Sequence, residues 1–122
     1  MKKIESFTDL IAWQQSHQLA VSIYKTTKTF PREETYSPTD QMRRCSVSIS
    51  SNIAEGFIRR GKKEKLQFYY TAKGSLIELQ NQLLLARDVG HLHKEEFATL
   101  AEKTITVHRL INGFIKSATS KD

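Results

Sequence analysis

Apolar residues recur every three or four positions along most of the chain, and this spacing predicts amphipathic helices. Four segments carry the pattern, at about residues 8–29, 38–60, 62–89 and 94–117. Phe30-Pro31 follows the first segment, Gly61 separates the second from the third, and Gly90 follows the third. Short links between four helices favour an all-α, antiparallel, up-down-up-down four-helix bundle, formed as a single domain over residues 1–122.

The helix starts have recognisable caps. Ser6 or Thr8 can cap the first helix, with Asp9 in its first turn, where the helix dipole favours an anion. The second helix begins with Ser37-Pro38-Thr39-Asp40, which has the spacing of a capping box and a proline in the first turn. Gly74 lies inside the third helix and predicts a close contact with a neighbouring helix.

The apolar faces of the second and third helices are wider than a single bundle core requires. On the second helix, small polar residues lie beside the apolar stripe and would let a neighbouring helix approach closely: Ser46, Ser48, Ser50, Ser51 and Asn52. On the third helix, Phe68, Tyr70, Leu84 and Leu85 form a second apolar side. A lone chain of 122 residues would leave part of these faces in water, so we expect a homo-oligomer.

The charge of the chain is concentrated in one segment. The formal net charge is +6, and nearly all of the excess lies in residues 41–65. The basic residues of this segment are Arg43, Arg44, Arg59, Arg60, Lys62, Lys63 and Lys65. A local basic excess suits a polyanion such as nucleic acid, and a solvated lysine-rich surface is the alternative explanation.

The composition excludes several classes of protein. Hydrophobic residues make up 39% of the chain, too many for a disordered protein, and no apolar run approaches the roughly 20 residues of a membrane span. No apolar stretch follows the basic N-terminus, so we expect no signal peptide and a cytoplasmic location. The lone Cys45 allows neither an internal disulfide nor a cysteine zinc cage, and it is expected to be a buried, unreactive thiol.

One stretch of the second helix resembles a known signature. It consists of Asp40-Gln41-Met42-Arg43-Arg44 followed by Val47-Ser48-Ile49-Ser50-Ser51-Asn52-Ile53-Ala54-Glu55-Gly56-Phe57. The string is similar to that of the four-helix-bundle proteins encoded in intervening sequences of bacterial 23S rRNA genes. Asp9-Leu10, Trp13-Gln14 and Ala72-Lys73-Gly74-Ser75-Leu76-Ile77-Glu78-Leu79 agree with the same family. The resemblance covers about residues 7–92. Ser50 and Ile58 depart from it, at places where the family often has proline and glycine.

This resemblance implies a bundle that assembles as a ring-like homopentamer. It also implies kinship with the accessory protein of diversity-generating retroelements, a basic pentamer that engages nucleic acid and a reverse transcriptase. No catalytic activity is established for the family, so the resemblance implies neither an enzyme nor a cofactor.

Two polar residues of the second helix form a candidate site of another kind. Asn52 and Glu55 lie one turn apart, and a carboxylate there could serve as a general base. A structural polar network that fixes helix or subunit register, with Glu55 paired to an arginine of a neighbouring helix, is the preferred interpretation. We therefore assign no catalytic residues.

The sequence offers no convincing metal site. The Glu-x-x-His pairs of di-iron bundles are missing. His17 and His108 fall on or beside apolar stripes and are expected to be core residues. His91 and His93 could hold a surface metal, but two ligands without a third are a weak site.

The sequence therefore predicts a non-enzymatic, oligomeric protein that binds nucleic acid, RNA more than DNA. The seven basic residues of segment 41–65 would contact phosphates. No base-reading motif accompanies them, and Tyr69 and Tyr70 are the nearest aromatic residues that could stack on bases. The alternative is a protein-interaction scaffold that docks a partner enzyme or another protein.

Overall fold

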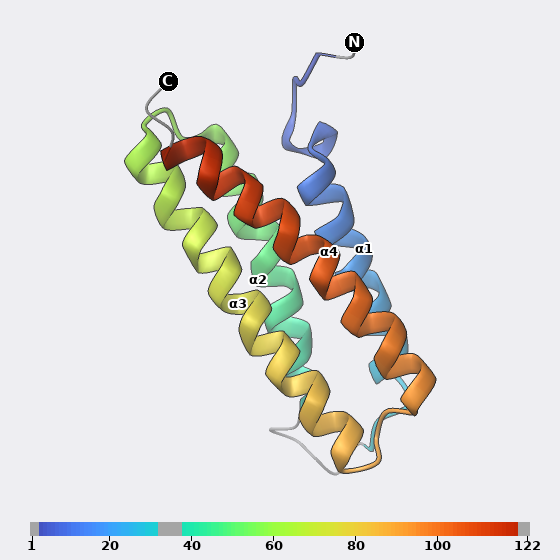
Figure 1. Cartoon of the computed structure of the whole chain (residues 1–122). Helices are drawn as coiled ribbons and strands as arrows, with labels where there is room; N and C mark the ends of the chain where they lie inside the picture. The colour runs from blue at the N-terminus through green and yellow to red at the C-terminus, as the bar shows by residue number, and fades with distance from the viewer. Residues whose placement is uncertain (1–2, 32–37, 120–122) are drawn as a thin grey trace.

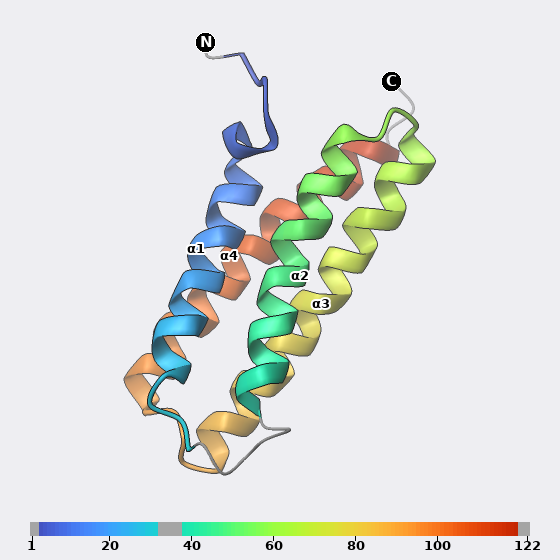
Figure 2. The ribbon, with the colours of Figure 1, turned by 180° about the vertical axis from the view of Figure 1, so that it is seen from behind.

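Four helices form the molecule, in the arrangement that the apolar periodicity predicts. The computed structural model describes residues 3–31 and 38–119. Its elements are the 3-10 turn η1 (Phe7–Asp9), α1 (Ile11–Thr27), α2 (Pro38–Ile58), α3 (Lys62–Asp88) and α4 (Lys94–Thr119). Each helix packs against the next one in the chain, and α4 packs against α1 (Figure 1 and Figure 2). The all-α, antiparallel four-helix bundle is thus confirmed.

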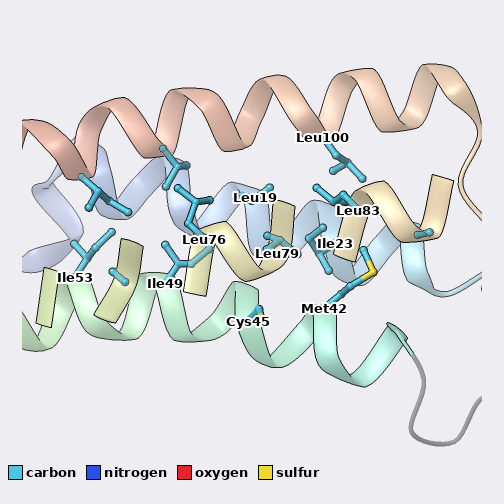
Figure 3. Close-up of a cluster of buried hydrophobic side chains, with 14 of the residues drawn as sticks. Leu19, Ile23, Met42, Cys45, Ile49, Ile53, Leu76, Leu79, Leu83 and Leu100 are labelled. Atoms are coloured by element: carbon cyan, nitrogen blue, oxygen red, sulfur yellow. The ribbon is translucent and has the colours of Figure 1, made fainter. Parts of the chain in front are cut away.

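The core lies along the axis between the helices. Side chains from all four helices meet there in successive layers (Figure 3). The largest fully buried ones include Leu19, Ile23, Met42, Ile49, Ile53, Leu76, Leu79, Leu83, Val107 and Ile111. They recur at intervals of three, four or seven within each helix, so each helix turns one stripe inward. Burial of such side chains contributes about 1.5–3 kcal/mol each.

The first helix begins later than the sequence predicts. Ser6 does cap the chain, because its hydroxyl accepts from the backbone N–H of Thr8 at 3.2 Å, and Asp9 completes a capping box. The capped element is the single turn η1, however, and the backbone at Leu10 is extended. Because Leu10 interrupts the helical hydrogen bonding, α1 begins at Ile11 instead of Thr8.

Two other helix ends agree with their signals. Pro38 is the first residue of α2 and Asp40 lies in its first turn, whereas the predicted cap at Ser37 lies outside the described residues. Gly90 has a φ of +86°, and the backbone N–H groups of His91 and Leu92 donate to the carbonyl of Ala86. This left-handed residue ends α3, as expected for a glycine after a helix.

The glycines of α2 and α3 have opposite surroundings. A Cβ atom at Gly56 would lie 2.6 Å from the Tyr69 ring, so the close contact between α2 and α3 requires glycine there. Around Gly74 the space is open, and the close helix contact predicted for that position is wrong. Gly56 is where the two helices converge toward their connecting turn.

One histidine that was expected in the core of the first helix lies at the surface instead. His17 is exposed and stacks on Trp13, with ring centroids 4.8 Å apart. Tyr24 is 42% exposed. The face of α1 that packs inward consists of Ala12, Ser16, Leu19, Ala20, Ile23 and Thr27.

Candidate nucleic-acid interface

The basic residues of segment 41–65 lie in two groups at opposite ends of α2. Arg43 and Arg44 are near the start of the helix, and Arg59 to Lys65 surround the turn into α3. At 1.5 Å per residue the groups are separated by about 24 Å. Figure 2 shows α2 with its first turns near the end of α1 and its last turns beside the start of α3. One chain therefore has two separate basic regions, one at each end of α2.

Arg43 is held by the end of α1. Its Nε donates to the hydroxyl of Thr27 at 2.9 Å, and one terminal nitrogen donates to the carbonyl of Tyr24 at 3.3 Å. Its guanidinium also lies 4.8 Å from the centre of the Tyr24 ring. A cation at the last carbonyls of a helix is favourable, so Arg43 fastens the end of α1 to α2.

Arg44 faces solvent. Its side chain is exposed, and the described residues give it no hydrogen-bond or ionic partner. Together with Arg43, Tyr24, Asp40, Val47 and Ser48, it borders an open hollow of about 570 Å³. Arg44 is therefore the member of this group whose guanidinium is exposed and not engaged by other described residues.

Two basic residues of the second group are also held within the chain. Arg59 pairs with Glu55 at 3.0 Å and lies over the Phe68 ring at 4.8 Å. The Nζ of Lys65 donates to the carbonyls of Gly56 and Phe57, at 3.1 and 2.9 Å. Lys65 thereby caps the end of α2 from the first turns of α3.

The other three members of the second group are exposed. Arg60, Lys62 and Lys63 flank Gly61, which lies just before the start of α3. Arg60 and Lys63 have no hydrogen-bond or ionic partner among the described residues. Of the seven predicted phosphate-binding residues, three thus contact other groups of the chain, three are exposed with no partner among the described residues, and Lys62 is exposed.

A pocket of about 430 Å³ adjoins this second group. The last turns of α4 lie beside the turn between α2 and α3 (Figure 1) and close one side of it. Its lining residues are Leu10, Phe57, Arg60, Lys62, Lys65, Tyr69, Phe114, Ser117 and Ala118. Sequence reasoning missed Phe57 and Phe114 as site residues, because only the packing of α4 brings Phe114 to this turn.

The two tyrosines proposed for stacking have different surroundings. Tyr69 is only 6% exposed, its ring centre is 5.2 Å from that of Phe114, and burial raises the pKa of its phenol. Tyr70 is 53% exposed and points away from the core. Tyr69 thus forms part of the pocket wall.

Asn52 and Glu55 do not form one network. Asn52 donates to the carbonyl and the hydroxyl of Ser48, and the Ser48 hydroxyl is 2.8 Å from that of Ser75 on α3. Glu55 is exposed and pairs with Arg59, which directly follows α2, instead of an arginine of a neighbouring helix. Ser48, Asn52 and Ser75 form a side-chain polar link between α2 and α3.

The remaining candidate chemistry is sparse. Cys45 is buried, and burial together with the nearby Glu78 carboxylate raises the pKa of its thiol to about 11. His108 is half-buried, and its Nε2 has no hydrogen-bond partner in the described part of the chain. Residues 3–31 and 38–119 contain no group of three side chains suited to a metal ion, and none of their helices is long and apolar enough to cross a membrane.

Comparisons with known proteins agree with this fold. One solved structure, a protein of unknown function from the S23 ribosomal protein family of Bacteroides thetaiotaomicron, superposes with a TM-score of 0.80 at 18% sequence identity. The match covers 87% of this chain and 96% of the other. No curated protein sequence matches significantly. Residues 8–113 match the profile of the 23S rRNA-intervening sequence proteins, a span that reaches well into α4. The chain therefore belongs to the 23S rRNA-intervening sequence protein family.

Proposed function

We propose that this protein is a non-enzymatic, nucleic-acid-binding bundle that acts in the cytoplasm as a homo-oligomer. The observation that carries the proposal is the division among its basic residues. Arg44, Arg60 and Lys63 are exposed and have no partner among the described residues, and Lys62 is exposed beside them. A basic side chain that forms no hydrogen bond or ion pair within the chain is available to bind the phosphates of a polyanion.

RNA is the preferred ligand. The family takes its name from sequences that interrupt 23S rRNA, which makes RNA the first nucleic acid to test. The exposed cations lie at the start of α2 and at its junction with α3, an arrangement that suits contacts with a phosphate backbone. We expect recognition of RNA shape and unpaired segments, because no base-reading motif accompanies the basic residues in the sequence.

Self-association is supported by the outer surface of α3. Tyr70, Ile77 and Leu84 recur every seven residues and are 53%, 50% and 43% exposed, so they form an apolar row. An exposed apolar row on a helix is typical of a subunit interface. In the proposed assembly, a pentameric ring, the two basic regions of each chain repeat around the ring and multiply the phosphate contacts.

A binding titration tests the proposal. Labelled single-stranded RNA, duplex RNA and duplex DNA are titrated with the full chain at several salt concentrations. We expect affinity to fall steeply with salt and RNA to bind more tightly than DNA. The salt slope is the steepness with which the logarithm of the binding constant falls against the logarithm of the salt concentration. In a triple variant, R44Q/R60Q/K63Q, this slope should be smaller by about 0.7–0.9 for each phosphate that the protein no longer neutralises.

A second triple variant separates position from total charge. Lys28, Lys94 and Arg109 are exposed and lie outside segment 41–65, so K28Q/K94Q/R109Q removes the same charge elsewhere. Its affinity and salt slope should stay close to those of the unmodified protein. If both triple variants bind RNA equally weakly, binding depends on the total charge of the protein and not on the position of the cations. That result would contradict the proposed interface.

A protein-interaction scaffold is the second candidate function. The exposed apolar row on α3 favours it too, because the row could receive another protein instead of a second copy of this chain. The two candidates differ in an observable way. A monomer in solution that binds no RNA at low salt would favour the scaffold.

A further inference from the structure

The pocket beside the α2–α3 turn combines two kinds of surface. Its interior is apolar and largely aromatic, with Phe57 from α2, Tyr69 from α3 and Phe114 from α4. Its other side carries the cations Arg60, Lys62 and Lys65. The volume of about 430 Å³ falls within the range of small-molecule sites.

One of the three positive charges at this pocket, that of Lys65, is fixed in place. Lys65 donates two of its three ammonium hydrogens to the carbonyls of Gly56 and Phe57, and it lies 5.8 Å from the Phe57 ring centre. The start of α3 adds the positive end of a helix dipole, and Gly61 offers no side chain to cap it. The Lys65 ammonium group and the N-terminal end of α3 lie close together, so both can attract the anionic end of a ligand.

The aromatic side of the pocket is rigid. Tyr69 and Phe114 pack against each other, and the Tyr69 ring cannot retreat because it fills the space that Gly56 leaves open. Phe57 and Phe114 are half-buried, so part of each ring is accessible from the pocket. Flat aromatic ligands stack on such surfaces with little sequence preference.

We propose that this pocket binds one unpaired nucleotide, with its base against Phe57 and Phe114 and its phosphate beside Arg60 and Lys62. The nucleotide can come from a free mononucleotide or from an unpaired position of an RNA chain. The RNA source rests on the proposed function, whereas the chemistry of the pocket is testable without it.

The first experiment uses adenosine 5′-monophosphate as the probe. It is titrated into the ¹⁵N-labelled full chain, in parallel with ribose 5-phosphate, which lacks the base. We expect the nucleotide to shift the backbone amide signals of Lys65 and Ser117. We also expect it to bind at least about tenfold more tightly than ribose 5-phosphate, a difference of about 1.4 kcal/mol in binding free energy. Equal affinities for the two probes would mean an anion site only and would overturn the inference.

Variants connect the binding to the pocket. Ala118→Trp fills the pocket from α4 and should abolish nucleotide binding, whereas Ala98→Trp places the same side chain at an exposed position of α4 outside the pocket. Phe114→Leu keeps an apolar side chain but removes the ring, and should weaken binding about tenfold, or about 1.4 kcal/mol. Unchanged affinity in both Ala118→Trp and Phe114→Leu would also overturn the inference.

An RNA arm separates this inference from the proposed function. Ala118→Trp should weaken binding of a single-stranded RNA about tenfold and leave a fully paired duplex unaffected. If single-stranded RNA binds equally to the variant and the unmodified protein, the pocket does not take unpaired positions of RNA, and the proposed function stands. If neither RNA binds but the mononucleotide still does, the proposed function fails and the pocket is a site for free nucleotides.

Discussion

Arg43 and Arg44 are neighbours in the chain with opposite roles. Arg43 reaches back to Thr27 and to the carbonyl of Tyr24, while Arg44 extends into solvent. Their difference comes from helical geometry, since successive residues point about 100° apart and only one of them faces the end of α1.

Separate substitutions of this pair should therefore have opposite effects. Arg43→Met should lower the free energy of unfolding by about 1–2 kcal/mol, because it removes two hydrogen bonds from a charged group. Arg44→Met should change stability by less than about 0.5 kcal/mol and lower the salt slope of RNA binding by about 0.7–0.9. Denaturant unfolding and the RNA titration measure the two effects, and each variant is the control for the other.

The Cys45 thiol predicts a pH dependence. Its pKa is about 11 in the folded chain against an ordinary value of 9.0, so the unfolded chain ionises first as pH rises. The thiol should therefore not affect stability below about pH 9, and stability should fall by up to about 2–3 kcal/mol as pH rises toward 11. Cys45→Val, which cannot ionise, should show a smaller fall over that range in denaturant unfolding. Identical pH profiles for the two proteins would contradict the assignment.

At the scale of the helix pair, α2 and α3 are joined closely at their turn. Gly56 lets the Tyr69 ring approach, and Lys65 bonds the last carbonyls of α2. Further along the pair, the Ser48, Asn52 and Ser75 side chains connect the helices through hydroxyl and amide groups. The turn that carries Arg60 and Lys63 is held by these contacts.

Two glycine substitutions test this arrangement. Gly56→Ala should destabilise the protein by about 1–3 kcal/mol, because the added methyl group lies 2.6 Å from a buried ring. Gly74→Ala, in open space within α3, should stabilise it by about 0.4–1 kcal/mol. Thermal melts of the two variants give the comparison, and a stabilising Gly56→Ala would contradict the close packing of Tyr69.

The sequence predicted the elements better than the contacts between them. The spacing of apolar residues identified all four helices, and Gly90 marked the end of α3. It misplaced the start of α1, because the local cap formed by Ser6 and Asp9 closes a separate turn before Leu10. The spacing of apolar residues indicates which side of a helix faces the core. A capped turn of three residues is shorter than one helical repeat, so it produces no such spacing.

The candidate site was predictable only in part. The concentration of charge in segment 41–65 is visible in the sequence. Which of its members remain available is a tertiary property, because Arg43 and Lys65 are occupied by carbonyls of α1 and α2. The aromatic pocket depends on how α4 lies against the turn, which no local pattern encodes.

At the scale of the whole molecule, the apolar row on α3 predicts the state of the protein in solution. Small-angle scattering should give a mass of about five chains of 14.0 kDa for the unmodified protein. Ile77→Glu combined with Leu84→Glu should lower that mass and leave helix content unchanged, since both side chains are exposed in the single chain. Val21→Glu, at an exposed apolar position of α1, is the matched control. An unchanged mass in the double variant would place the interface elsewhere.

The order in which the helices pack has a consequence for how the chain folds. Most contacts between helices join consecutive elements, and only the contact of α1 with α4 joins the two ends of the sequence. Consecutive helices close short loops at a small entropic cost, so the α2–α3 hairpin can form early. The contact between α1 and α4 closes the longest loop, so we expect it to form last. Folding of a single chain should therefore be fast, and the slower, concentration-dependent step should be the meeting of subunits.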